Sequence, residues 1–235
     1  KSFVDSFVSG SLSVSNQRNI GLRPWTKDIV DRTLYIMGGS ISALESSLED
    51  GIAGNLAGGT HHSYFDYGSG YCIFNDLVIC ASYVKNNYSI IKKVLVVDLD
   101  VHQGDGTASM TSGDDSVFTF SMHCSSNFPL KKMESDLDVP ISRYITEGSY
   151  LEILDSHLKK LKETLPDIVF YQAGVDTLKE DKLGHMAITK EGMKKRDNIV
   201  LNFCKELGVP VLVFMGGGYS DPLTHTVDAF TNCLL

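Results

Sequence analysis

VLVVDLDVHQGDG, residues 94–106, is the stretch that decides the fold. Its first four residues are all apolar, which is typical of a strand buried on both faces of a parallel sheet. Asp98, Asp100 and His102 then alternate, and side chains two residues apart in a strand point to one side. They are therefore predicted to converge at the strand's carboxyl end, where open α/β sheets place their ligands. Two carboxylates and an imidazole are costly to bury alone, so the pattern predicts a metal site.

Strand and helix patterns alternate along the whole chain. The predicted strands are short apolar runs at residues 52–57, 94–100, 117–122, 168–173 and 209–215. The predicted helices are residues 28–48, interrupted at Gly38-Gly39, then 76–86, 150–164, and 190–207, the last with Thr189 as N-cap and Gly208 after its end. This spacing favours right-handed crossovers and a sheet covered on both faces. We expect an α/β protein: a single three-layer αβα domain over residues 1–235 with a mainly parallel central sheet.

Polar residues follow four of the predicted strands. They read GGTHH (58–62), DLDVHQGDG (98–106), GVDT (174–177) and GGGYSD (216–221). Because the carboxyl ends of parallel strands meet at one edge of a sheet, all four clusters are predicted to gather there. A functional site explains this coincidence better than four unrelated turns do.

Composition limits the partners and the location. Lys+Arg 21 against Asp+Glu 29 gives a net charge of −8, and 43% of the residues are hydrophobic, enough for a sizeable core. The acidic balance argues against direct nucleic-acid or anionic-membrane binding. The five cysteines are scattered without a CxxC pair, and neither a signal peptide nor an 18-residue apolar stretch is present. We therefore expect a cytoplasmic protein without a membrane span, or a nuclear one if the source is a eukaryote.

Asp100, His102 and Asp176 are the candidate metal ligands. The simpler alternatives are a capped strand end for the first two residues and an ordinary turn for GVDT. Together, two aspartates and a histidine leave positions open for water and substrate. The usual catalytic zinc sites contain more histidine, so the residues alone leave the identity of the metal open.

His61 and His62 are candidates for general acid–base catalysis beside the metal. Asp98 and Asp105 are carboxylates close to the metal ligands in the sequence, and each is able to accept the distal N–H of one histidine. Such a partner fixes the tautomer and raises the basicity of the ring. The alternative is a pair of loop histidines without chemistry.

Tyr219 follows three glycines, which allow a close approach of the backbone to a ligand. Its hydroxyl is a candidate to stabilise an oxyanion. The alternatives are a plain turn or a phosphate-binding loop, but a P-loop is excluded because no Lys-Ser/Thr follows. The sequence has no GxSxG elbow and no HExxH motif. His185 is a candidate for the rim of the site, and three other histidines are expected to be ordinary surface or structural residues: His123, His157 and His225.

With these residues identified, the chain resembles the zinc-dependent histone deacetylase family, which has the arginase/deacetylase fold. The resemblance runs from Phe3 to the end of the chain. It rests on six motifs in family order: GGTHH (58–62), GSGYCIFND (68–76), VDLDVHQGDG (97–106), FSMH (120–123), YQAGVDTL (171–178) and MGGGYSD (215–221).

The resemblance implies roles for the site residues. One zinc ion per chain would be held by Asp100, His102 and Asp176. His62 would be the main general base and acid, bound to Asp105, and His61 its electrostatic partner, bound to Asp98. Tyr219 would polarise the acyl carbonyl. A structural potassium ion would lie near Asp98, Asp100, His102 and Ser121. The substrate channel would have Tyr71 and Phe128 as walls and Gly70 as floor.

The chain departs from the family pattern at two positions. Gln103 stands where many members carry another histidine, and Tyr71 replaces the commoner phenylalanine. Gln103 resembles the class IV branch and its bacterial relatives. The opening residues look like the middle of a helix, so we expect the family's first strand and helix, and with them one wall of the pocket, to be missing here.

The expected reaction is zinc-dependent hydrolysis of the amide bond of N-acetyl-lysine, or of a longer N-acyl-lysine, in proteins or peptides. One alternative is deacetylation of acetyl-polyamines or other small acetylated amines. Another is a catalytically silent domain that binds acyl-lysine. A binuclear manganese ureohydrolase of the same fold would need further carboxylates, and those available are assigned to His61 and His62. The sequence leaves the oligomeric state open.

Overall fold

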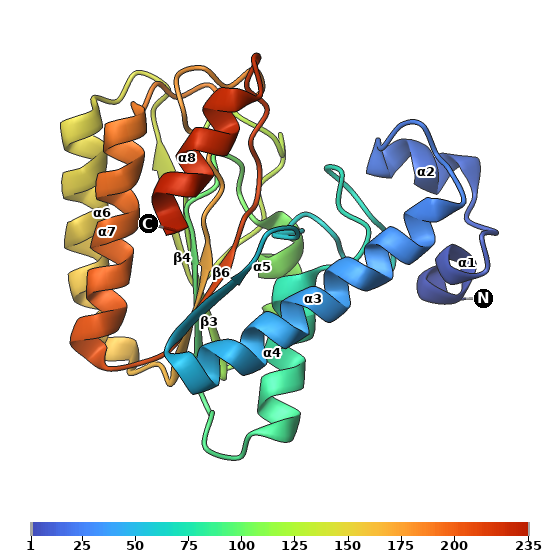
Figure 1. The fold of residues 1–235 in the computed structure, drawn as a ribbon, viewed down its shortest axis with the longest axis horizontal. Coiled ribbons are helices and arrows are strands. Elements are labelled where there is room, and N and C mark those ends of the chain that lie inside the picture. Colours follow the sequence, from blue (N-terminus) through green and yellow to red (C-terminus); the bar gives the residue numbers. More distant parts are fainter. Residues whose placement is uncertain (1, 235) are drawn as a thin grey trace.

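The computed structural model describes residues 2–234, and its middle layer is a six-stranded sheet (Figure 1). The strands are β1 (Ile52–Asn55), β2 (Val94–Asp98), β3 (Val117–Cys124), β4 (Leu137–Ile141), β5 (Ile168–Gln172) and β6 (Val211–Phe214). Their order across the sheet is β1-β6-β5-β2-β3-β4, and every neighbouring pair is parallel. The prediction of an α/β protein with a parallel sheet is confirmed.

Helices cover both faces of the sheet (Figure 1). On one face lie α6 (Glu147–Leu161), followed by the short 3₁₀ helix η1 (Lys162–Thr164), α7 (Lys190–Leu207) and α8 (Thr224–Leu234). On the other face lie α3 (Asp28–Asp50) and α4 (Asp76–Asn87), and α5 (Asp105–Thr111) contacts α4 and β3. Each face has its own apolar core, and all five residues of β2 are buried between the two. An uninterrupted apolar strand fits this central position because both of its faces are covered.

Helix ends follow the local sequence closely at α7. The Thr189 hydroxyl accepts the backbone N–H of Gly192, and Gly208 adopts the left-handed conformation with φ of 69°. Both features were predicted from residue type, since threonine caps amino-terminal N–H groups and glycine adopts positive φ without a steric cost. The predicted bounds of this helix are confirmed.

The predicted interruption of α3 at Gly38-Gly39 is wrong, because the helix runs unbroken from Asp28 to Asp50. Glycine inside a helix costs only about 1 kcal/mol relative to alanine, which tertiary packing readily offsets. At Gly39 that packing is visible: a Cβ atom there would lie 3.0 Å from Nδ2 of Asn55 on β1. The missing side chain therefore lets the helix lie close to the sheet.

Several elements lack a clear sequence signal and were not predicted: α2 (Val14–Ile20), α5, α8 and the edge strand β4. Most are short, and β4 is mostly half-buried with a proline in it, so neither length nor a regular apolar period marks it. The first helix, α1 (Phe3–Val8), packs with α2 around a small separate cluster that includes Phe3, Phe7 and Ile20. In Figure 1 these two helices stand away from the sheet.

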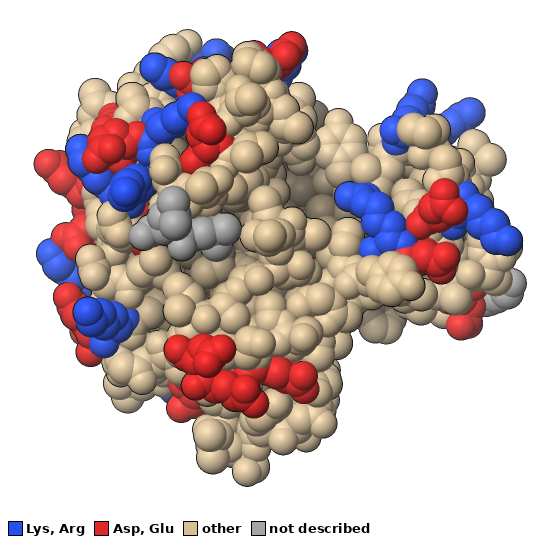
Figure 2. All heavy atoms as spheres, viewed as in Figure 1, with Lys and Arg blue, Asp and Glu red and all other residues tan. Residues whose placement is uncertain are grey.

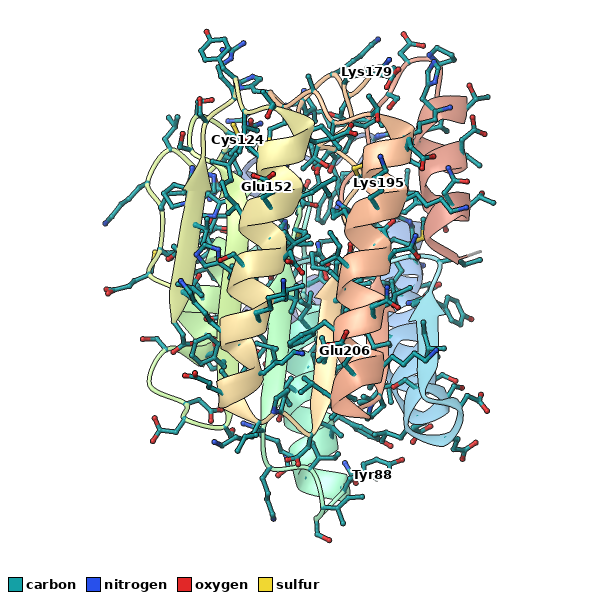
Figure 3. All side chains as sticks on the ribbon, turned by 90° about the vertical axis from the view of Figure 1, so that its left-hand side faces the viewer. Tyr88, Cys124, Glu152, Lys179, Lys195 and Glu206 are labelled. Atoms are coloured by element: carbon teal, nitrogen blue, oxygen red, sulfur yellow. The ribbon has the colours of Figure 1, made fainter. Side chains whose placement is uncertain are left out.

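The carboxyl ends of the strands form the upper edge of the sheet in Figure 3, where Cys124 ends β3. Lys179, which lies in the connection after β5, is labelled at the same edge, whereas Tyr88 lies beyond the opposite one. Crossing a membrane would take a longer and more apolar helix than any that the described part of the chain contains.

Candidate functional site

The four predicted polar clusters meet at the carboxyl edge of the sheet. Asp98 is the last residue of β2, which ends before Asp100 rather than at it. Asp100 and His102 therefore lie in the turn after the strand, and Asp176 lies in the loop after β5. The three side chains nevertheless converge, because the strands that carry them are neighbours in the sheet.

Asp100, His102 and Asp176 form a buried cluster whose side-chain ligand atoms all lie within 4.8 Å of one another. Nδ1 of His102 lies 3.0 Å from Oδ1 of Asp100 and 2.9 Å from Oδ2 of Asp176. Burial and the charge of Asp100 raise the pKa of Asp176 to about 7. Burial opposes a charge on His102, but the two carboxylates outweigh it and raise its pKa to about 10. The site thus favours a positive charge between its carboxylates, and its donor set fits a divalent metal such as zinc.

His61 and His62 lie side by side next to this cluster, both of them buried. Their ring centroids are 4.1 Å apart. Nδ1 of His61 lies 2.7 Å from Oδ2 of Asp98, and Nδ1 of His62 lies 2.6 Å from Oδ1 of Asp105. Each histidine therefore has its own carboxylate, which leaves its Nε2 free of that contact.

The two neighbouring rings have opposite pKa shifts. Burial opposes a charge on His61, but Asp98 and Asp100 outweigh it and raise the pKa to about 9. For His62, burial and the positive charge of His61 prevail over Asp105 and lower the pKa to about 4. At neutral pH, His61 is the charged ring and His62 the neutral one, a division that suits one electrostatic group and one base.

Asp76 holds the histidine-bearing loop in place, a role that sequence reasoning missed. It is fully buried at the start of α4. Its Oδ2 accepts the backbone N–H of Gly59 at 2.9 Å, and its Oδ1 accepts the backbone N–H of Thr60 at 2.8 Å. Its position as the first helical residue of the GSGYCIFND motif was the available signal, because carboxylates favour helix amino termini.

Tyr219 lies in the loop after β6, and it lines a cavity together with Asp100 and His102. Burial, then the charges of Asp100 and Asp176, raise the pKa of its hydroxyl, so the group remains a proton donor. The glycines before Tyr219 are needed because the backbone passes close to the carboxylates of Asp100 and Asp176. The N–H of Gly217 donates to Oδ2 of Asp100 at 2.8 Å, and a Cβ on Gly217 would collide with the carboxylate of Asp176.

A channel of about 380 Å³ leads to the cluster. The predicted walls Tyr71 and Phe128 both line it, and their side chains remain 46% and 42% exposed. Gly70 also lines it, and a Cβ there would lie 2.5 Å from Cδ2 of His62. His185 lines the same channel, in agreement with its prediction as a rim residue.

Ser121 and Gln103 are both buried and hydrogen-bonded to residues outside the metal cluster. Ser121 is the register neighbour of Asp98, and its hydroxyl lies 3.0 Å from Nδ1 of His123. His123 was expected to be either a surface or a structural residue, and its burial shows that it is a structural one. The Gln103 amide donates to the carbonyl of Met133 and to Oδ1 of Asp138, both at 2.7 Å. Gln103 also accepts the N–H of Met133 at 2.9 Å, so it anchors the loop that carries Phe128.

Comparison with solved structures supports the fold. The chain superposes on an acetylpolyamine aminohydrolase from Burkholderia pseudomallei with a TM-score of 0.74 and 19% sequence identity. The match covers 87% of this chain and 62% of that one. At this level of identity the likeness establishes a shared fold, and the deacetylase fold expected from the motifs is confirmed.

Sequence comparison identifies the family. An uncharacterized protein of Picosynechococcus is 47% identical over 93% of this chain and 72% of its own length. Histone deacetylase 2 of Arabidopsis thaliana is 32% identical over 78% of this chain, which spans about half, 48%, of that protein. The sequence profile of the histone deacetylase domain matches residues 3–234. A match of this extent establishes that the chain belongs to the histone deacetylase family.

Proposed function

We propose that the chain hydrolyses the amide bond between an acyl group and the side-chain amine of lysine in proteins or peptides. The observation that carries this proposal is the pair of adjacent buried histidines, each bound at Nδ1 to its own carboxylate, beside a buried Asp–His–Asp cluster. Amide hydrolysis by water needs a base for the attacking water, a donor for the carbonyl oxygen and a proton for the leaving amine.

Asp100, His102 and Asp176 would hold one zinc ion. When bound, a zinc ion acts as a Lewis acid and lowers the pKa of a water molecule. The neutral Nε2 of His62 is suited to accept the proton of the attacking water, because Asp105 occupies its Nδ1. The same ring, once protonated, is suited to return that proton to the leaving amine as the C–N bond breaks.

Tyr219 and His61 would stabilise the negative charge that develops on the carbonyl oxygen. Tyr219 keeps its proton because burial raises its pKa, so it is a hydrogen-bond donor throughout the working pH range. His61 carries a positive charge that Asp98 stabilises. We keep Asp98, Asp100, His102 and Ser121 as the proposed potassium site, since Asp98 and Ser121 lie at paired positions of neighbouring strands.

The channel supports a substrate with a long, slender amine. The channel is lined by Tyr71, Phe128 and Gly70, so an extended aliphatic chain would pass between two aromatic rings.

The thiols of four cysteines are free and buried: Cys72, Cys80, Cys124 and Cys204. They support the reducing, cytoplasmic location predicted from the sequence.

Small acetylated amines are the second candidate substrates. The structural likeness to an acetylpolyamine aminohydrolase favours them, because a polyamine chain and a lysine side chain fit the same narrow channel. Acidic charge on the protein, with a net charge of −8, also favours cationic amines.

The test compares two substrates on one enzyme preparation. We expect an acetyl-lysine peptide to be hydrolysed with a higher kcat/KM than acetylspermidine, and both activities to vanish in His62→Ala while zinc remains bound. The reverse order of kcat/KM would favour the small-amine alternative. Absence of turnover with every acyl-amine, in protein containing one zinc ion per chain, would contradict the proposal and favour a binding domain.

A further inference from the structure

A second cavity adjoins the metal cluster on the side away from Phe128. It has a volume of about 500 Å³. Six residues line both this cavity and the substrate channel: Gly21, His62, Gly70, Tyr71, His102 and Tyr219. Phe128 lines only the channel, whereas Gly58, Gly59 and Met37 line only this second space. The two spaces therefore meet at the reacting centre. If the amine occupies the channel, the acyl group of the same substrate extends into the second cavity.

The second cavity is far larger than an acetyl group requires. Pockets of roughly 300–1,000 Å³ hold drug-sized ligands, whereas the acyl carbon of an acetyl group carries a single methyl. The apolar part of the wall comes from α3 and the GSGYCIFND motif, at Ile36, Met37 and Ile73. Such a wall accommodates methylene groups between the reacting carbon and the far end of the cavity.

Two arginines also line this cavity. Arg32 lies on α3 and Arg23 in the segment before it, and both side chains are exposed to solvent. Neither belongs to the ion pairs formed within the described residues 2–234. In Figure 2 a hollow separates the body of the molecule from the amino-terminal helices, and basic side chains border it on the helix side.

The positive charges of Arg23 and Arg32 are unexpected in the wall of a cavity that borders an acidic site. The chain has a net charge of −8, and the cluster itself contributes the carboxylates of Asp98, Asp100, Asp105 and Asp176. An anionic acyl group would be repelled from this region unless a cation faced it. A guanidinium presents a planar set of N–H donors that matches a carboxylate in two parallel hydrogen bonds.

We infer that the second cavity selects acyl groups that end in a carboxylate, with Arg32 and Arg23 as the groups that recognise it. The substrate class is lysine acylated by one end of a dicarboxylic acid, such as succinyl-lysine, glutaryl-lysine or adipoyl-lysine. Water cleaves the same amide bond, so the products are the free lysine amine and the dicarboxylate. This inference rests on the proposed function, because it concerns the acyl half of the same substrate.

The experiment compares matched acyl groups on one peptide. Each carboxylated acyl-lysine is paired with the neutral acyl-lysine of equal carbon number: succinyl with butyryl, glutaryl with valeryl, and adipoyl with hexanoyl. For at least one pair, kcat/KM is expected to be higher for the carboxylated member. Arg32→Gln and Arg23→Gln are each expected to lower that ratio about fivefold, the size of an ionic contact with partial solvent screening. Higher salt is expected to lower it as well.

Arg18→Gln is the matched control. It removes the same charge from the same amino-terminal region, but Arg18 lies on α2 and lines neither cavity. The ratio is expected to stay unchanged in this variant. A neutral preference in all three pairs, or a ratio that Arg32→Gln, Arg23→Gln and Arg18→Gln alter equally, overturns the inference.

Binding separates failure of this inference from failure of the proposed function. If no acyl peptide is hydrolysed, the proposed function fails. Calorimetric titration with glutarate and with the neutral amide valeramide still tests the cavity. Tighter binding of glutarate than of valeramide, weakened in Arg32→Gln but not in Arg18→Gln, supports the carboxylate site. Equal affinities for the two compounds overturn it.

Discussion

Nδ1 of His62 lies 2.6 Å from Oδ1 of Asp105, and the Tyr64 hydroxyl donates a hydrogen bond of 2.9 Å to Oδ2 of the same carboxylate. The ring of His62, the proposed base, is therefore oriented by a carboxylate that a tyrosine hydroxyl also contacts. Tyr64 stacks on Tyr67 with ring centroids 4.5 Å apart, and this contact holds the Tyr64 hydroxyl in position. Nothing in the sequence distinguished Tyr64 from other loop tyrosines.

The pH dependence of activity follows from the environment of His62. A base must be neutral to act, so kcat/KM falls as pH drops through its pKa in the free enzyme. Burial and the charge of His61 lower that pKa from 6.5 to about 4. We expect a flat profile between pH 6.5 and 8 and a loss of kcat/KM only at lower pH. A half-maximal point at or above 6.5, in protein that remains folded by circular dichroism, would contradict this expectation.

Tyr64→Phe should move that acidic limb. Without the tyrosine hydroxyl, more negative charge remains on the Asp105 oxygen that faces His62, which stabilises the protonated ring and raises its pKa. The limb of the kcat/KM profile should shift to higher pH, while zinc content stays constant. Tyr83→Phe is the control, because it removes a tyrosine hydroxyl that donates to Oε1 of Glu45 and not to Asp105. Identical profiles for the two variants would argue against this role.

Tyr219→Phe should remove most of the turnover and leave the metal in place. Loss of one hydrogen-bond donor to a developing oxyanion costs about 10²–10³-fold in kcat in other enzymes. The hydroxyl is not one of the atoms in the Asp100–His102–Asp176 cluster, so zinc content measured by mass spectrometry should match the wild type. Tyr71→Phe restores the residue commoner in the family and should keep turnover. Wild-type kcat in Tyr219→Phe would exclude the proposed role.

Metal removal should destabilise the protein. Without a cation, the carboxylates of Asp100 and Asp176 are buried together, and burial with mutual repulsion raises the pKa of Asp176 to about 7. Chelation should therefore lower Tm. Added zinc should restore it, because free zinc at one hundred times its Kd raises the free energy of unfolding by about 2.7 kcal/mol. Asp176→Asn should lose this response. Two metal ions per chain instead of one would revive the manganese ureohydrolase alternative.

Gln103→Ala should weaken substrate binding more than the chemical step. Gln103 fixes the backbone of Met133, and the Lys132 ammonium in the same loop donates to the carbonyls of Asn127 and Pro129 on either side of Phe128. Loosening this loop should raise KM several-fold, since one lost buried hydrogen bond costs about 1–3 kcal/mol, with a smaller change in kcat. Asn87→Ala, which removes a side-chain hydrogen bond to the carbonyl of Tyr83 far from the channel, serves as control. Equal effects on kcat and KM would indicate a general loss of structure.

The sequence by itself determined the parallel α/β fold and the position of the site. The uninterrupted apolar run at 94–97 required a strand covered on both faces. The polar residues that follow four of the strands had only one edge of the sheet at which to gather. Local rules were enough for α7, where residue type alone fixes both ends. They were not enough for the edge strand β4 or for α3, where packing against Asn55 outweighs the helix-breaking tendency of glycine.

Only the tertiary structure decided the distances and the charges within the site. The family resemblance implied that Asp98 binds His61 and that Asp105 binds His62. In the folded chain these pairs lie at 2.7 Å and 2.6 Å, and Asp76 holds the loop that carries the two histidines. The opposite pKa shifts of two adjacent histidines arise because burial and charge act over distances in space, not along the chain. The second cavity, with Arg23 and Arg32 in its wall, exists for the same reason: the segments that line it are far apart in sequence and meet only in the folded protein.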